Sequence, residues 1–445
     1  MLPSPGLKKI LAKIKKLKAS VTISETEIHI TIDLTHSNLL ELTPFLYILL
    51  NKYEEDFLII IKGVPYCLLK DAPDHLLYKK APKINYTKDN ICRQCHYAHI
   101  CPGWIQDTPT PRPTAVRYLP REIVLEVTNR CHLRCPICFG PYKKFDMSWN
   151  TLTRFIDECV DLGINDIRFT GGEPLLYKQL PKAIAYAKKK KRYIIVNTTA
   201  TFLPSRIKNA LVKYADNLLI SLQGYSPQTN AYLTQSQDHT TSYFQKKLKN
   251  IFELNQIIKE VRIGTIISQT LIKNFHKYYR LISSLGIKYW ELYRGMSPPL
   301  KKEFNVSPQD LSNLINQIHS IKSRRKAILI ANPVPFCITP NHTLNRNVLY
   351  GAQSDDGHSR LIVDVQGYLK PSYLISKNLG NTIKQAWHHP FLEKLKKNDY
   401  LPSDCHSCDS LNLCKGGSRY WANLTYNTYY EKDPLMKCPT LTTTH

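Results

Sequence analysis

The sequence predicts an α/β protein, an open or closed barrel of six β/α units with Cys-rich modules at both ends of the chain. Two observations lead to this fold class. Strand-like and helix-like segments alternate in six successive units between residue 121 and about residue 331, which predicts parallel strands joined by right-handed crossovers. The 13 Cys residues, apart from Cys159, gather in groups before, within and after this region. We therefore expect an N-terminal α+β domain over residues 1–114, the barrel over residues 115–331 and a Cys-rich domain over residues 332–445.

The six units can be followed along the chain. Strands are expected at the segments EIVLEV, DIRFT, YIIVN, NLLISL, VRIGTII and KYWELY. Helices are expected over residues 151–162, before the run KKKKR, from Pro204 onward, and over residues 243–254, 275–285 and 308–322. Because the catalytic groups of such barrels lie at the C-terminal ends of the strands, the motifs that follow these strands are the candidates for chemistry.

The chain is strongly basic. Lys and Arg outnumber Asp and Glu by 61 to 35, which gives a net charge of +26. This charge would attract nucleic acid, an anionic membrane face or an acidic peptide. We favour the simpler explanation that lysines are spread over solvated faces. The sequence contains neither a secretory signal nor the ~18 apolar residues that a membrane span needs. We expect a cytoplasmic protein with no membrane span, in which clustered Cys residues indicate metal or redox chemistry.

The N-terminal region has two further features. The segment SVTISETEIHITIDL alternates with period two and predicts a hairpin, whose edge could pair with a peptide strand or serve structure alone. A helix, a strand, V-P-aromatic-Cys and then C-x2-C-x5-C-x-G occur in this order near both ends of the chain. The spacers differ between the two copies, so we interpret them as a repeated structural device.

Three thiols lie on one short loop directly after the first strand of the barrel. The segment TNRCHLRCPICFG places Cys131, Cys135 and Cys138 in a C-x3-C-x2-C spacing. Three thiolates can hold three corners of a four-iron four-sulfur cluster and leave the fourth iron open, and an open position implies chemistry. The alternative is a zinc site that uses His132 as its fourth ligand.

The next strand ends in FTGGEP. Gly171 and Gly172 allow the backbone to approach a ligand closely, and Glu173 offers a carboxylate to an ammonium group. Together with the three-Cys loop, this motif resembles the radical S-adenosylmethionine (radical SAM) superfamily. The resemblance implies a partial (β/α)6 radical SAM barrel over roughly residues 115–331. It also implies that the three Cys residues hold the catalytic cluster and that its open iron chelates the amino and carboxylate groups of SAM. Reductive cleavage of SAM then gives a 5′-deoxyadenosyl radical, which abstracts a hydrogen atom from the substrate.

The resemblance also implies further contacts with SAM at later strand ends. Gly171, Gly172 and Glu173 would meet its amino group, and four other residues are weaker matches: Asn197, Thr198, Ser221 and Gly264. Two positions depart from the family pattern. Ile137 stands where an aromatic residue often precedes the third Cys, and Gln223 stands where many relatives have Asp.

The C-terminal region resembles the SPASM extension of peptide-modifying radical SAM enzymes. The motifs that carry this resemblance are DVQGYLKPS, LGNTIKQAWHHP, CHSCDSLNLCKGGSRYWA and MKCP. It implies an auxiliary cluster held by four thiols, namely Cys405, Cys408, Cys414 and Cys438. The extension's other cluster is expected to be missing, because Ser372 and Ser418 occupy two of its Cys positions. The internal repeat names Cys337 as the alternative to Cys438.

A second complete four-Cys set lies in the N-terminal domain and consists of Cys67, Cys92, Cys95 and Cys101. Either terminal set could hold zinc, because C-x2-C spacing also suits a tetrahedral zinc site. We favour two auxiliary four-iron clusters, because of the x5 spacing and because they accompany a radical SAM core.

The sequence therefore predicts a radical SAM enzyme that modifies a peptide or protein side chain. Such an enzyme needs SAM and an external electron donor of the flavodoxin or ferredoxin type. One alternative is a radical SAM enzyme of small-molecule or tetrapyrrole cofactor biosynthesis. The other is a non-enzymatic iron–sulfur protein that binds nucleic acid, which the intact GGEP motif disfavours because a binding module does not need it.

Overall fold

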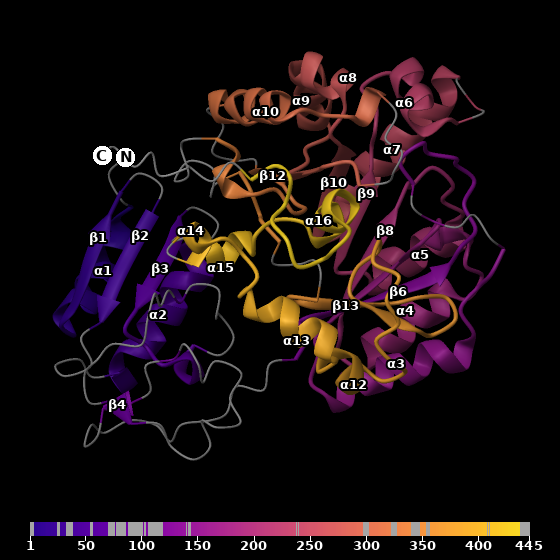
Figure 1. Ribbon diagram of the computed structural model, residues 1–445. Coiled ribbons are helices and arrows are strands. Elements are labelled where there is room, and N and C mark those ends of the chain that lie inside the picture. The colour runs from indigo at the N-terminus through magenta and orange to yellow at the C-terminus, as the bar shows by residue number, and fades with distance from the viewer. Residues whose placement is uncertain are drawn as a thin grey trace. The chain divides into compact units, whose positions relative to one another are not determined.

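Figure 1 shows the computed structural model of the chain. The residues that the structure describes are 4–24, 27–32, 39–53, 57–69, 76, 86–87, 101, 104–105, 119–138, 140, 144–236, 238, 240–296, 302–321, 327–339, 348–352, 357–406, 408, 410–436. The chain divides into two compact units. One comprises residues 1–118 with residues 407–412, and the other comprises residues 119–406 with residues 413–445. No helix formed by the described residues is long and apolar enough to cross a bilayer.

The first unit contains a three-stranded sheet with two helices. Its elements are α1 (Pro5–Lys16), β1 (Ala19–Ile23), β2 (Glu27–Ile32), α2 (Leu39–Tyr53), β3 (Leu58–Lys62), η1 (Tyr66–Leu68), β4 (Tyr86–Thr87) and β5 (Trp104–Ile105). Strands β1 and β2 form the predicted antiparallel hairpin, and β3 pairs in parallel with β2 on its other side. The parallel pairing follows from α2, which lies between β2 and β3 in the chain and provides the crossover that parallel strands require.

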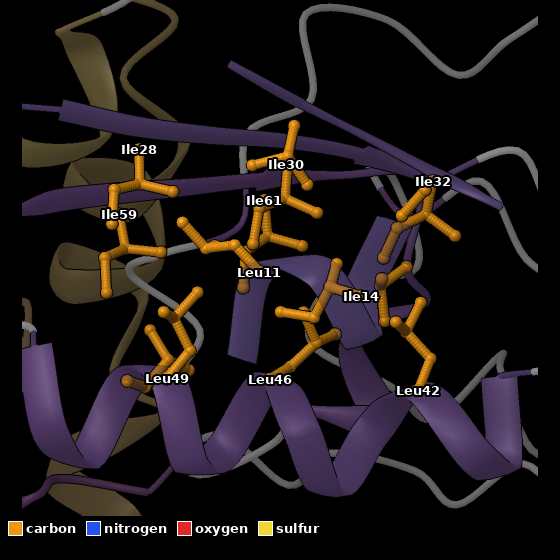
Figure 2. Packing of buried hydrophobic residues seen from close by; sticks show 14 of the residues in the cluster. Leu11, Ile14, Ile28, Ile30, Ile32, Leu42, Leu46, Leu49, Ile59 and Ile61 are labelled. Carbon is orange, nitrogen blue, oxygen red and sulfur yellow. The ribbon is translucent and has the colours of Figure 1, made fainter. Parts of the chain in front are cut away.

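Both helices pack on one face of this sheet. Figure 2 shows Leu42, Leu46 and Leu49 of α2 pointing towards the isoleucines of β2 and β3. Leu11 and Ile14 of α1 belong to the same core, and all five of these leucine and isoleucine side chains are at most 3% exposed. The opposite face of the sheet is more polar. This one-sided burial explains the period-two pattern of β1 and β2.

The internal repeat seen in the sequence is also a structural repeat. In the first copy, α2 and β3 are followed by η1, and Ile61 then forms an isolated parallel bridge with Leu76. In the second copy, α10 (Pro308–Ser320) and β12 (Ala327–Ile330) are followed by η6 (Phe336–Ile338), and Ile330 bridges Leu349 in the same way. Both copies therefore place a Cys within a short 3₁₀ helix directly after a strand.

The second unit is built on a nine-stranded sheet in the order β12-β11-β10-β9-β8-β7-β6-β13-β14. The strands not yet given are β6 (Glu122–Thr128), β7 (Asp166–Gly171), β8 (Tyr193–Thr198), β9 (Asn217–Ser221), β10 (Glu260–Ile266), β11 (Tyr289–Tyr293), β13 (Arg360–Val363) and β14 (Leu369–Lys370). Strands β6 to β12 are parallel and adjacent in chain order, which confirms the six predicted units. Sequence reasoning missed β13 and β14, which extend the sheet beyond β6.

Helices follow the strands along the chain and lie in an arc outside them (Figure 1). They are α3 (Trp149–Asp161), α4 (Leu180–Lys189), α5 (Ser205–Tyr214), α6 (Pro227–Thr234), α7 (Thr241–Ile257), α8 (Gln269–Lys273), α9 (Phe275–Ser284) and α10. The first of them shows why they form. The Ser148 hydroxyl caps α3 by accepting the Thr151 N–H at 3.1 Å. The apolar stripe of α3 is buried and includes Cys159, which is 1% exposed and belongs to the core as predicted.

The sheet of the second unit is strongly curved. Arg168 on β7 donates hydrogen bonds to Glu122 on β6 at 2.7 and 2.8 Å and to Asn197 on β8 at 3.0 Å. It also interacts electrostatically with Tyr293 on β11. A flat sheet would hold β7 and β11 about 19 Å apart, since neighbouring strands are ~4.8 Å apart. The sheet therefore curls towards a barrel, in agreement with the predicted fold class, and charged side chains fill part of its inner face.

The last part of the chain forms short helices. They are α12 (Ile383–Trp387), α13 (Pro390–Lys397), α14 (Ser403–His406), α15 (Leu411–Cys414) and α16 (Arg419–Tyr426). The 3₁₀ helices η4 (Pro174–Leu176) and η5 (Lys302–Phe304) complete the described elements of the second unit.

Candidate functional site

The three-Cys loop begins where β6 ends, and an ion pair holds its start. Arg130 donates to both carboxylate oxygens of Asp146, at 3.0 and 2.5 Å, and to the Leu176 carbonyl at 2.8 Å. The Thr128 hydroxyl donates to the same carboxylate at 2.6 Å. Asp146 lies beyond the third Cys, so these contacts tie the two ends of the loop together. Sequence reasoning did not identify this pair, because a single Arg and a single Asp 16 residues apart form no motif.

The three thiols lie close enough on the loop for their charges to interact. Cys131, Cys135 and Cys138 are all half-buried. Burial, and then the nearby thiolates of Cys138 and Cys131, raise the pKa of the Cys135 thiol to about 12. Backbone amides two residues further on donate to two of the sulfurs at 3.4 Å, Leu133 to Cys131 and Gly140 to Cys138. Clustered thiols with N–H donors to sulfur suit an iron–sulfur cluster, whose properties depend on such hydrogen bonds.

This arrangement differs from a single-ion site. Among the described residues, no three His, Cys, Asp or Glu side chains are placed to hold one metal ion. His132, the predicted fourth ligand of the zinc alternative, has an exposed side chain. A four-iron cluster binds each thiolate to a different iron, so its ligands need not converge on one point.

The two glycines bring the end of β7 into contact with the three-Cys loop. Gly171 has a φ of +128°, and a Cβ there would lie 2.2 Å from the Thr128 carbonyl oxygen. A Cβ on Gly172 would lie 2.2 Å from the Arg130 carbonyl oxygen. The Gly172 and Glu173 amides donate to these two carbonyls, each at 2.7 Å. The glycines therefore serve a close approach between two backbones, which fixes the position of the loop.

Glu173 is buried and fully hydrogen-bonded within the protein. One carboxylate oxygen accepts the Leu175 N–H at 3.1 Å and the Thr198 hydroxyl at 2.7 Å. The other accepts the Thr199 N–H at 2.8 Å and the Thr199 hydroxyl at 2.7 Å. Four bonds use the whole acceptor capacity of a carboxylate. Glu173 thus joins β7 to the end of β8, and an ammonium group would have to displace one of the hydroxyl donors to bind it.

Lys247, a buried cation that the sequence did not reveal, lies near Glu173 and Cys135. Lys247 on α7 is 2% exposed. Burial lowers the pKa of its ammonium group to about 8, while Cys135 and Glu173 attract the charge and oppose the shift. Burying a charge is costly unless an opposite charge accompanies it. Lys247 stands among several lysines in QKKLKN, so no sequence signal distinguished it.

The other predicted SAM contacts lie on the following strands. Asn197 interacts with Arg168 on the inner face of the sheet, and Ser221 and Gly264 are register partners on β9 and β10. A Cβ on Gly264 would lie 3.3 Å from both the Tyr293 ring and the Leu219 side chain, so this glycine makes room for an aromatic residue. None of the contacts found joins Ser221 or Gly264 to the three-Cys loop within the described residues.

Gln223, the departure from the family's Asp, has a structural role. Its side-chain oxygen accepts the Ile266 N–H at 2.8 Å, and its side-chain nitrogen donates to the Gly264 carbonyl at 3.5 Å. The side-chain amide of Gln223 therefore makes two hydrogen bonds to the β10 backbone, like those that a neighbouring strand would make. An Asp, which lacks the N–H donor, could make only the first of these bonds.

The terminal Cys sets are described only in part. Cys67 and Cys101 both pack against the core of the first unit, whereas Cys92, Cys95 and Cys438 lie outside the described residues. Cys405 and Cys337 are half-buried, Cys414 is buried and Cys408 is exposed. Cys408 accepts the Ser410 N–H at 3.4 Å, which is the same hydrogen-bond pattern as at Cys131 and Cys138.

The two serines at the expected Cys positions accept backbone hydrogen bonds, Ser418 as a helix cap and Ser372 within a loop. The Ser418 hydroxyl accepts the Trp421 N–H at the start of α16, and the Ser372 hydroxyl accepts the Ile375 N–H, both at 3.3 Å. Both residues are buried. Beside Ser418 lies a buried ion pair, in which Arg294 donates to Asp433 at 2.9 Å. Asp433 also accepts the Ser418 N–H at 2.7 Å. A polar network thus surrounds one position where a cluster ligand would otherwise stand.

This network gives a stability prediction. Replacing Asp433 by Asn should leave the buried Arg294 charge without a counterion and cost about 3–5 kcal/mol of unfolding free energy. Glu431→Gln is the matched control, because Glu431 is exposed and surface charge changes are usually within about 0.5 kcal/mol. Urea unfolding of the two variants measures the difference. Equal midpoints would show that the ion pair does not stabilise this part of the chain.

Comparison with known proteins identifies a family and several relatives. Residues 125–275 match the family model of the radical SAM superfamily. A PqqA peptide cyclase of Granulibacter bethesdensis is 23% identical over 67% of this chain and 82% of its own length. A GTP 3′,8-cyclase of Clostridium botulinum is 26% identical over 62% of this chain and 93% of its own length.

Two solved structures share the fold. Streptococcus suis SuiB superposes with a TM-score of 0.59 at 17% identity, over 72% of this chain and 78% of SuiB. The protein named anSMEcpe, in a structure with bound AdoMet and a Cp18Cys peptide, gives 0.55 at 16% identity over 70% of this chain and 92% of its own. The segment that matches the family model contains the three-Cys loop, the GGEP motif and Lys247. Residues 125–275 thus form a radical SAM domain, and this match together with the peptide cyclase relative indicates an enzyme.

Proposed function

We propose that this radical SAM enzyme modifies a side chain of a peptide or protein. The observation that carries the proposal is the match to a PqqA peptide cyclase along two thirds of the chain. The likeness to SuiB, which has also been solved with the precursor peptide SuiA, supports it. A small-molecule substrate is the second candidate, because the GTP 3′,8-cyclase match also covers most of that enzyme.

The site residues then have distinct roles. Cys131, Cys135 and Cys138 hold a four-iron cluster, which when bound supplies the electron that cleaves the SAM sulfonium. Gly171 and Gly172 hold the β7 end against the three-Cys loop, and Glu173 orders the end of β8. Asn197, Thr198, Ser221 and Gly264 provide the predicted surface for the rest of SAM. An external flavodoxin- or ferredoxin-type donor supplies the electrons.

Lys247 completes this site as the cation that binds the SAM carboxylate. Its burial beside Cys135 and Glu173 supports the assignment, since one buried ammonium group can offset an anion brought by the cofactor. Lys247→Met should raise the Kd for SAM by about tenfold or more, the effect of losing a charged hydrogen bond. Lys246→Met, at an exposed neighbouring position, should leave it unchanged. Isothermal titration of the anaerobic protein with SAM measures both, and equal affinities would remove Lys247 from the site.

We assign two auxiliary clusters to the terminal Cys sets. Cys67, Cys92, Cys95 and Cys101 form one, within a domain spanning residues 1–114. Cys405, Cys408, Cys414 and Cys438 form the other, in a SPASM-like domain spanning residues 332–445 that follows the barrel of residues 115–331. The N–H donor to Cys408 supports a cluster there. The hydrogen bonds that the Ser372 and Ser418 hydroxyls accept from backbone amides support the loss of the extension's other cluster.

Metal analysis tests this assignment. Three four-iron clusters predict about twelve irons per chain after anaerobic reconstitution. If one terminal set binds zinc, the same measurement should give about eight irons and one zinc. Iron at about four per chain, with no zinc, would contradict both assignments for the terminal sets.

The substrate class is tested by anaerobic incubation with SAM, dithionite and candidate peptides encoded beside the gene. A peptide substrate should change in mass while 5′-deoxyadenosine accumulates, and mass spectrometry follows both products. Peptides that stay unchanged while GTP or another small molecule is consumed would favour the second candidate.

A further inference from the structure

The C-terminal domain contains one thiol more than its proposed cluster needs. Its Cys residues are Cys337, Cys405, Cys408, Cys414 and Cys438. A four-iron cluster takes four thiolates, and the set proposed for it leaves out Cys337. The neighbours of this residue in η6, Phe336 and Ile338, are each 1% exposed, whereas Cys337 is half-buried. Within η6, Cys337 is thus the residue that a ligand can reach.

The internal repeat relates Cys337 to a residue already proposed as a ligand. Cys67 in η1 and Cys337 in η6 occupy the same place in the two copies, after a strand and before a parallel bridge to that strand. Cys67 is the one Cys of the N-terminal domain outside the run C-x2-C-x5-C, so a cluster there needs it as the fourth ligand. Cys101, the last Cys of that run, packs against the same core as Cys67. The equivalent pair in the second copy is Cys337 and Cys414.

The residues that precede Cys337 and Cys414 contact the same glycine. Gly351 has a φ of +76°, and a Cβ there would lie 2.1 Å from the Leu413 carbonyl oxygen and 3.2 Å from the Phe336 ring. Leu413 directly precedes Cys414, and Phe336 directly precedes Cys337. The close approach at Gly351 therefore holds the two Cys-bearing segments next to each other.

The chain that follows Cys414 returns to the same place. The Gly417 N–H donates to the Cys414 carbonyl at 3.0 Å, which closes a turn. A Cβ on Gly417 would lie 2.9 Å from the Pro335 side chain, and Pro335 is close to Cys337 in the chain. The segment of Cys337 thus meets the chain on both sides of Cys414.

A third thiol lies on a segment that meets this turn. A Cβ on Gly416 would lie 2.4 Å from the Leu401 side chain, and Cys405 follows Leu401 in α14. The segments of Cys337, Cys405 and Cys414 therefore converge on one turn. A four-iron cluster binds each thiolate to a different iron, so thiols spread around a turn suit a cluster.

Positive charge beside this turn also suits a cluster. Arg419 is fully buried and donates to the Gly416 carbonyl, and Lys415 lies within the turn. Asp433, which borders the turn, is already paired with Arg294 at 2.9 Å. A four-iron cluster with four thiolates is an anion, and buried charges are stable when an opposite charge accompanies them.

We propose that Cys337 is a fifth thiol of the C-terminal cluster site and binds the iron that Cys438 leaves open. The proposal rests on the proposed function, because it takes the C-terminal Cys set to hold a four-iron cluster. In the exchange, Cys337 binds as a thiolate and its proton passes to the departing Cys438 thiolate. Two thiols then serve one iron, so the cluster keeps four thiolates whichever is bound. An open position implies chemistry, so a cluster closed in this way transfers electrons and binds no substrate.

Alkylation of the full anaerobic chain identifies which thiols are bound. In Cys438→Ala, Cys337 should react with iodoacetamide at least about tenfold more slowly while iron is bound than after a chelator removes it, because a bound thiolate is no longer a free nucleophile. In the parent, Cys337 and Cys438 together should give about one alkylated residue per chain. Peptide mass spectrometry locates the label. Equally fast alkylation of Cys337 with and without iron in Cys438→Ala would overturn the proposal.

Cyanide tests the same point without access to the thiol, because it binds an iron that lacks a thiolate. Cys135→Ala serves as the background, since the open iron of the catalytic cluster would also bind cyanide. In this background, cyanide should leave the electron paramagnetic resonance spectrum of reduced Cys438→Ala unchanged. Adding Cys337→Ala should make the spectrum sensitive to cyanide or remove about four irons. Adding Cys159→Ala instead is the matched control and should do neither.

Two results of this experiment would contradict the proposal. A spectrum that responds to cyanide in Cys438→Ala while Cys337 is present would show that Cys337 does not bind the open iron. A spectrum that is unchanged by cyanide after Cys337→Ala is added, with full iron, would show that another group closes the cluster.

These measurements need neither SAM nor turnover, so they do not depend on the substrate class. If Cys414→Ala contains as much iron as the parent, the C-terminal set holds no cluster, and this inference fails together with that assignment. If Cys414→Ala loses its four irons but Cys337 fails the tests above, this inference alone is rejected and the proposed function stands.

Discussion

Cys135→Ala should abolish 5′-deoxyadenosine formation. Cys135 lies between the other two Cys residues of the loop, and its thiol is close enough to both for their charges to raise its pKa. Removing it leaves two of the three thiols that we propose as ligands of the catalytic cluster. We expect the catalytic four irons to be lost and SAM to stay intact under anaerobic reducing conditions. Iron analysis and chromatography of the reaction mixture measure the two effects.

Cys159→Ala is the control for this variant. Cys159 is a core residue of α3 at 1% exposure, so its replacement should cost modest stability and no activity. A Cys135→Ala protein that cleaves SAM at the parental rate would show that the three-Cys loop does not hold the catalytic cluster. Loss of activity in both variants would instead indicate a general folding effect of Cys replacement.

Gly172→Ala should lower the rate of SAM cleavage by ~100-fold or more, the cost of displacing a site by about 1 Å. The added Cβ would lie 2.2 Å from the Arg130 carbonyl oxygen and 2.7 Å from its carbon. Both are backbone atoms, so the β7 end and the three-Cys loop must move apart. Anaerobic assays with iron content measured in parallel separate a displaced cluster from a lost one.

Gly163→Ala is the control for Gly172→Ala, because it adds a Cβ at a glycine without crowding any neighbouring atom. Gly163 has a φ of +73°, but a Cβ added there would meet no atom within 4 Å, so Ala at this position costs only the conformational strain of about 1–2 kcal/mol. The variant should retain activity. If Gly172→Ala is as active as Gly163→Ala, the close contact between the β7 end and the three-Cys loop is not needed for catalysis.

Much of the fold follows from local patterns. The six strand–helix units were predictable because buried parallel strands are short apolar runs, and helices such as α3 show a 3.6-residue apolar stripe. Pairing between distant segments was not predictable in this way. Strand β13 joins β6 although more than 230 residues separate Arg360 from Glu122, and four residues of mixed character do not specify a partner.

The same distinction between local patterns and long-range packing applies to the residues of the candidate site. Cys131, Cys135, Cys138 and the two glycines occur in short motifs with a fixed spacing, so the sequence indicates them. The partners of Glu173 and the burial of Lys247 depend on how β8 and α7 pack. The spacing of residues in the sequence does not indicate this packing. Glu173 shows the consequence, because its carboxylate accepts bonds from Thr198 and Thr199, whereas the motif alone suggested a free acceptor for an ammonium group.

The fate of SAM in the anaerobically reconstituted wild-type protein tests the assigned chemistry most directly. With dithionite as reductant, we predict 5′-deoxyadenosine in an amount at least equal to the protein chains present, and none when the reductant is omitted. Intact SAM in a protein that carries its full iron, bound through Cys131, Cys135 and Cys138, would contradict the assignment.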